Sequence, residues 1–138
     1  MLLWEENIMR KMTFLAAALA AFALPAFADQ AHGLWKTKPD DNGNYGHVQI
    51  QTCSNGKICG GLTRAFNARG EQIESPNIGR AIVWDMEPQG DGQYRNGRVY
   101  APDRDRTYNA RMELRGNTLG VSGCVMGICR EQEWTRVQ

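Results

Sequence analysis

The sequence predicts an all-β fold, a single small antiparallel barrel of eight strands. Strand-like runs alternate with turn residues every 8 to 14 positions, the pattern of a β-meander. All 15 glycines lie after residue 28, and no segment keeps helical periodicity over three turns. Eight short strands in about 110 residues can close a barrel that holds one small ligand. A two-sheet sandwich of the same strands is the alternative.

The first 28 residues are predicted to be a cleaved secretory signal peptide. Arg10 and Lys11 supply the positive start, residues 14–24 are an apolar run, and an A-x-A cleavage motif ends at Ala28. The apolar run is shorter than the roughly 20 residues that cross a bilayer. We therefore expect an exported protein, periplasmic or secreted, without a stable membrane anchor.

The mature chain is expected to be one domain, residues 29–138. The acidic stretch before Met9 suits a signal peptide poorly, so translation is expected to start at Met9 or Met12 rather than Met1. The mature chain carries 14 basic and 13 acidic residues, a balance that favours neither nucleic acid nor a membrane surface as partner. The sequence leaves the oligomeric state open.

The first three strands are bounded by clear turn residues. The first ends before the Pro39–Gly43 turn, and the second alternates, with Val48 and Ile50 on one face and His47 on the other. Asn55-Gly56 is a strong hairpin signal between the second and third strands. These strands are expected at residues 33–37, 45–52 and 58–66.

The remaining five strands follow a long loop, residues 67–79. Turns at 89–92, 102–105 and 116–117 divide the rest of the chain, each marked by Gly, Pro, Asp or Asn. The expected strands are residues 80–86, 93–100, 107–114, 118–124 and 129–137.

Four cysteines in an exported chain indicate two disulfides. Three connectivities are possible, and the spacing favours Cys53–Cys59 with Cys124–Cys129, because each pair brackets a short turn. Each would add about 2 kcal/mol of stability. A zinc site is the competing interpretation, which an oxidising compartment and the C-x5-C and C-x4-C spacings disfavour. We expect no metal and no cofactor.

Several motifs together resemble the bacterial secreted family called domain of unknown function 2147. They are Gly33-Leu34-Trp35, Ile58-Cys59-Gly60, residues 96–102 and the terminal Trp134-Thr135-Arg136. The resemblance implies a lipocalin-like, calycin-type barrel in the cell envelope. It also implies that Trp35 packs under Arg136 and closes one end of the barrel through a cation–π contact.

An aromatic and arginine-bearing face is the candidate ligand pocket. By alternation Arg98 shares a face with Tyr94 and Tyr100, and a guanidinium among apolar walls suits an amphipathic ligand with a carboxylate or phosphate head. His47 joins the candidates if its strand face points inward. The ligand-pocket candidates are His47, Trp84, Tyr94, Arg98, Tyr100, Tyr108 and Met112.

The function predicted from these features is non-enzymatic binding of a small hydrophobic or amphipathic molecule. One alternative is a filled barrel that binds an envelope protein or glycan through its surface. The weakest alternative is a small hydrolase or isomerase that uses His47, since no paired nucleophile accompanies it in the sequence.

Overall fold

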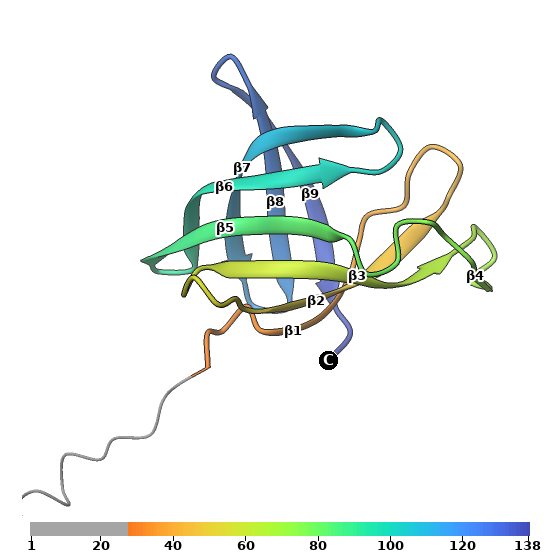
Figure 1. Cartoon of the computed structure of the whole chain (residues 1–138), viewed down its shortest axis with the longest axis horizontal. Coiled ribbons are helices and arrows are strands. Elements are labelled where there is room, and N and C mark those ends of the chain that lie inside the picture. The colour runs from red at the N-terminus through yellow and green to blue at the C-terminus, as the bar shows by residue number, and fades with distance from the viewer. Residues whose placement is uncertain (1–27) are drawn as a thin grey trace, which may run out of the picture.

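Residues 28–138, the part described by the computed structural model, form one antiparallel β-barrel (Figure 1). The strands are β1 (Gly33–Lys36), β2 (Tyr45–Thr52), β3 (Ile58–Phe66), β4 (Gln72–Ile73), β5 (Ala81–Gly90), β6 (Gln93–Ala101), β7 (Arg106–Arg115), β8 (Thr118–Val125) and β9 (Ile128–Arg136). Eight of them form a ring in the order β1-β9-β8-β7-β6-β5-β3-β2, which closes because β2 pairs with both β1 and β3. The ring confirms the predicted barrel and excludes the sandwich.

The predicted strands agree with the observed ones to within a few residues at each end. The predicted loop 67–79 contains the two-residue strand β4, which pairs with the end of β3 outside the ring. The predicted signal peptide lies outside the described residues, except for Ala28. Among residues 28–138 we find no helix that could cross a bilayer.

Large apolar side chains fill the interior of the barrel. The least exposed of them, at 2% or below, are Trp35, Val48, Ile50, Ile58, Val83, Met86, Met112, Leu119 and Trp134. Met86 and Met112 are the most adaptable of these side chains, because an unbranched thioether repacks more readily than a branched side chain.

A short N-terminal segment, residues 29–32, covers one end of the barrel, and we call it the plug. Trp35 Nε1 donates to the carbonyl of Ala31, and the Tyr94 hydroxyl donates to Asp29. Asp29 also accepts from the backbone N–H of Ala31, which folds the plug on itself. Ala31 is fully buried, so the plug belongs to the core and seals that end.

Arg136 locks the plug in place. Its guanidinium lies 4.3 Å from the centre of the Trp35 ring and donates to the carbonyls of His32 and Gln30 at 2.9 and 2.8 Å. The contact between Trp35 and Arg136 is the closure that the family resemblance implies. It joins the first and last strands of the ring at the same point.

Both disulfides pair as the spacing favoured. Cys53 joins Cys59 across the turn between β2 and β3, and Cys124 joins Cys129 across the turn between β8 and β9. Each is therefore a local staple of one hairpin. The four cysteines leave no free thiolate for zinc.

Two adjacent bulges reverse the side-chain alternation in the middle of the sheet. Asp85 of β5 and Asn96 of β6 have positive φ angles of 57° and 63°. The pairing of β6 with β7 shifts by one residue between Tyr94 and Gly97. Asn and Asp tolerate this left-handed conformation better than most residues do. From Gly97 onward, each β6 side chain lies on the face of the sheet opposite to the one that unbroken alternation from Tyr94 predicts.

We expect Arg136→Ala to lower the free energy of unfolding by about 2–3 kcal/mol, because it removes two hydrogen bonds and the cover over Trp35. Urea denaturation would measure the loss. Arg136→Lys should recover only part of it, since an ammonium lacks the planar fork. The matched control is Arg104→Ala, in an exposed turn, which should change stability by less than about 0.5 kcal/mol. Equal effects of the two alanine variants would contradict the role of the lock.

Candidate ligand site

The end of the barrel opposite the plug is lined by partly exposed apolar side chains. Val99 of β6 lies opposite Tyr108 of β7, and a Cβ on Gly123 of β8 would lie 3.5 Å from Val99 and 3.3 Å from Tyr108. All three residues are partly exposed, whereas Ala110 and Met112, deeper on β7, are buried. We call Val99, Tyr108 and Gly123 the rim.

One arginine faces the inner side of the sheet beside the rim. Along β9, Trp134 pairs with Leu119, Gln132 with Val121, and Arg130 with Gly123. Because Trp134, Leu119 and Val121 are buried and paired residues share a face, Gln132 and Arg130 also lie on the inner side.

Arg130 and Gln132 are nevertheless exposed, because the wall beside them is incomplete. β8 pairs with β9 along its whole length, but β1 pairs with β9 only at Trp35↔Arg136 and Lys36↔Thr135. Upstream of these two pairs, β9 has no strand partner on the side of β1 among residues 28–138.

The interior also holds an unsatisfied donor. Trp134 exposes 2% of its surface, and within the described residues its Nε1 has no hydrogen-bond partner. A buried donor without an acceptor costs about 1–3 kcal/mol. The indole N–H is therefore suited to an acceptor oxygen on a bound molecule.

Three of the predicted pocket residues face the interior. Tyr94 and Met112 lie opposite each other on β6 and β7 and are buried, with 3% and 1% of their surfaces exposed. Tyr108 lies above them in the rim. These three residues form a wall along the inside of the barrel from the plug to the open end.

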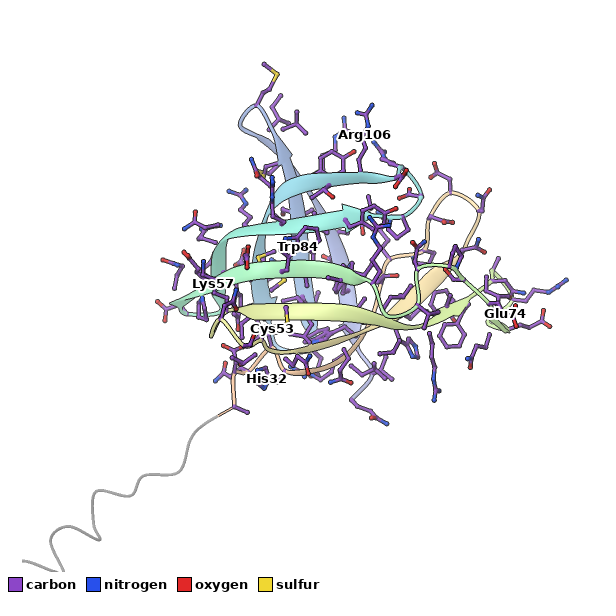
Figure 2. All side chains as sticks on the ribbon, viewed as in Figure 1. His32, Cys53, Lys57, Glu74, Trp84 and Arg106 are labelled. Carbon is purple, nitrogen blue, oxygen red and sulfur yellow. A yellow bond between two sulfur atoms is a disulfide. The ribbon has the colours of Figure 1, made fainter. Side chains whose placement is uncertain are left out.

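Arg98 and Trp84 lie on the outer face, so the expectation that Arg98 shares a face with Tyr94 was wrong. The bulge at Asn96 is the reason, since it reverses the alternation between Tyr94 and Arg98. Arg98 is exposed and donates to Asn109 at 2.9 Å. Trp84, labelled on β5 in Figure 2, pairs directly with Arg98.

Tyr100 has the same strand parity as Arg98, but it is buried and belongs to the hydrophobic core cluster that includes Tyr94 and Met112. The Arg80 guanidinium lies 3.5 Å from the centre of its ring, and its hydroxyl donates to Asp105 at 2.7 Å. These contacts give Tyr100 a structural role in holding the loop before β5 and the turn between β6 and β7.

His47 also faces outward, between Lys36 and Arg64 in the sheet register. Its ring lies 4.6 Å from that of Phe66, and its buried Nδ1 has no partner among the described residues. Burial lowers the pKa of His47, and the charges of Arg64 and Lys36 lower it further. Both effects favour the neutral imidazole, and among the described residues no carboxylate forms a hydrogen bond with its Nδ1.

Two recesses lie apart from the rim. The larger, of about 440 Å³, lies beside the plug and is lined by Gln30, Asp91, Gly92, Leu114, Gly116 and Arg136. The smaller, of about 150 Å³, lies over β6–β9 among polar side chains that include Arg111 and Glu131. Neither includes Val99 or Tyr108, so a ligand inside the barrel requires interior side chains to move.

Arg130 is absent from the ligand-pocket candidates predicted from the sequence, where Arg98 was preferred to it. Residues 130, 132 and 134 alternate onto one face of the last strand, and Trp134 marks that face as internal. The alternation was visible in the sequence. The open edge that exposes Arg130 was not, because it depends on how briefly β1 pairs with β9.

A family model described as "Uncharacterized protein conserved in bacteria (DUF2147)" matches residues 33–136. Among solved structures the chain is similar to "Protein HP1028 from the human pathogen Helicobacter pylori", whose description assigns it to the lipocalin family. The TM-score is 0.63 at 17% identity, over 79% of this chain and 84% of that one. This likeness establishes the fold. No curated protein sequence matches the chain.

We expect the protein to lose stability above about pH 10, where tyrosines ionise in the unfolded chain. Burial raises the pKa of Tyr94, and its hydrogen bond to Asp29 raises it further. A raised pKa in the folded state contributes stability below the unfolded value, and that contribution is lost as pH rises. Urea denaturation at pH 8 and pH 11 would measure it.

Tyr94→Phe should cost about 1 kcal/mol at pH 8 through the lost hydrogen bond, and the difference from the unchanged protein should narrow at pH 11. Tyr45→Phe, on the outer face of β2, is the control. If the difference in the free energy of unfolding between Tyr94→Phe and the unchanged protein were the same at both pH values, the pH dependence would not come from a neutral, buried Tyr94 hydroxyl.

Proposed function

The chain belongs to the bacterial family described as DUF2147, and on that premise we propose that it is an exported, non-enzymatic binder of a small amphipathic molecule. The ligand's apolar part would enter past the rim, and its anionic head group would bind Arg130. The lipocalin-like fold is typically a binding fold, which supports the proposal without specifying a ligand.

The observation that carries the proposal is the placement of Arg130. Its side chain is on the inner side of β9, where Arg136 at the plug is the other inward cation of this strand and already covers Trp35. Among the described residues it forms no salt bridge. A guanidinium at the mouth of an apolar interior is the arrangement that a fatty acid or lysolipid phosphate requires.

The packed interior makes the proposed site one that opens on binding. Met86 and Met112 lie between the rim and the plug, and both can change rotamer at low cost. The unpartnered Trp134 Nε1 would donate to a ligand oxygen once the interior opens. A preformed cavity is not needed for this mode of binding.

A second candidate function, a filled barrel that acts through its surface, is favoured by the same packing. Nine large side chains exposed to 2% or less leave the interior occupied in this state. Native mass spectrometry of the exported protein, purified with both disulfides intact, separates the two functions. A retained small molecule would support the binder, and a protein that stays free of ligand when offered lipids would support the surface module.

We expect lauric acid to raise the melting temperature by about 5 °C or more at a hundredfold excess over its dissociation constant. Val99→Trp should abolish the rise, because an indole at the rim blocks entry. Thr107→Trp is the matched control, an exposed neighbouring position on the outer side of β7. Equal rises in both variants would rule out entry past the rim.

Two further substitutions test the polar contacts. Arg130→Gln should lower the affinity for lauric acid about tenfold or more, because the charge-assisted hydrogen bonds to its carboxylate are lost. Its effect on dodecanol should be small, since an alcohol carries no charge. Trp134→Phe should lower the affinity for both ligands by about fivefold, because the hydrogen bond from the indole N–H is lost. Isothermal titration calorimetry would measure all four affinities.

A further inference from the structure

The hairpin between β8 and β9 projects beyond the barrel and carries an exposed apolar tip (Figure 1). Met126 is 96% exposed, Ile128 71% and Val125 53%, the three highest values among the large apolar side chains of residues 28–138. The Cys124–Cys129 disulfide lies directly beneath them. We call Val125, Met126 and Ile128 the stapled tip.

Met126, at the apex of the hairpin, is unfavourable for the backbone conformation of the turn. Met126 and Gly127 have φ angles of 52° and 81°, the conformation of a tight two-residue hairpin turn. Asn or Asp is strongly preferred over Met at the first of these positions, because a long side chain disfavours positive φ. Turn formation therefore does not explain the methionine, and its exposure excludes a role in the core.

Two arginines without salt bridges are connected to the base of the hairpin, one through the sheet register and one along β9. The row across the sheet runs from Trp84 to Arg98 to Asn109 to Cys124, and Arg130 follows Ile128 by two residues. Within residues 28–138 neither Arg98 nor Arg130 forms a salt bridge.

Glu131, next to Arg130 in the sequence, forms a salt bridge with Arg115 on the outer face. Asp85, next to Trp84, accepts a hydrogen bond from the neutral Asn55 amide at 3.0 Å and keeps its charge. Arg98 and Arg130 therefore present positive charge that no salt bridge among residues 28–138 neutralises.

We propose that the stapled tip docks the protein on an anionic phospholipid bilayer. The three apolar side chains enter the boundary between head groups and acyl chains, while Arg98 and Arg130 bind lipid phosphates.

A bilayer fits this surface better than a protein partner does. The tip is convex and consists of three side chains on a two-residue turn, far short of the ~800 Å² per partner that a stable interface buries. A bilayer needs no complementary surface, and the disulfide holds the tip extended without a partner. The contact is reversible, because three side chains bury too little apolar area for a permanent anchor.

Co-sedimentation of the exported protein with vesicles tests the proposal, with no fatty acid added, so the result is independent of ligand binding in the barrel. We expect binding to vesicles of phosphatidylethanolamine and phosphatidylglycerol that weakens with salt, and much weaker binding to phosphatidylcholine. Met126→Asn should reduce binding about tenfold while leaving the melting temperature equal or higher, because Asn-Gly is the preferred turn.

Two more variants define the surface. Arg98→Gln should reduce binding to the anionic vesicles about fivefold and leave phosphatidylcholine unaffected. Ile78→Asn, at an exposed apolar side chain in the loop before β5, is the matched control and should bind as the unchanged protein does.

Three results would overturn the proposal. The first is no binding of the unchanged protein to either vesicle, and the second is equal binding by Met126→Asn. The third is a concentration-dependent dimer in light scattering that Met126→Asn dissociates without any change in vesicle binding. That result would assign the tip to a second copy of the chain.

Discussion

The barrel depends on a short seam between its first and last strands. β1 and β9 share two residue pairs, fewer than the other neighbours in the ring. Arg136 compensates by covering Trp35 and by donating to two carbonyls of the plug. The same side chain therefore closes the ring and seals its end. Loss of this contact would open both together, because the plug has few other ties to the barrel.

The shortness of the seam also shapes the opposite end. Beyond Thr135 toward the hairpin, β9 has no partner on the side of β1, so its edge is free. Free edges invite pairing with other chains, and charged side chains discourage it. Glu131 and Glu133 occupy this edge and interact with Arg115 from the outer face. The edge is thereby protected while the inner side, with Arg130, stays accessible.

The sequence predicted the architecture well because its signals were local. Turn residues marked the strand boundaries, the cysteine spacing marked the staples, and the terminal motifs indicated the Trp35–Arg136 contact. The candidate pocket fared less well, because alternation along β6 assumes an unbroken strand. Asn96 inserts one residue, and Arg98 moves to the outside. Asn96-Gly97 resembled an ordinary polar stretch, and nothing in the sequence alone distinguishes a bulge there from a turn.

Stabilising and destabilising local features are distributed unevenly between the two ends of the barrel. Around the plug, the polar groups of Asp29, Tyr94 and Trp35 are paired, and apolar side chains are covered. At the hairpin end a methionine adopts positive φ, apolar side chains face solvent, and the exposed Arg130 forms no salt bridge among residues 28–138. Proteins usually retain such costly features where function requires them. The plug end therefore supplies the stability that permits the hairpin end to present an apolar tip and an unpaired guanidinium.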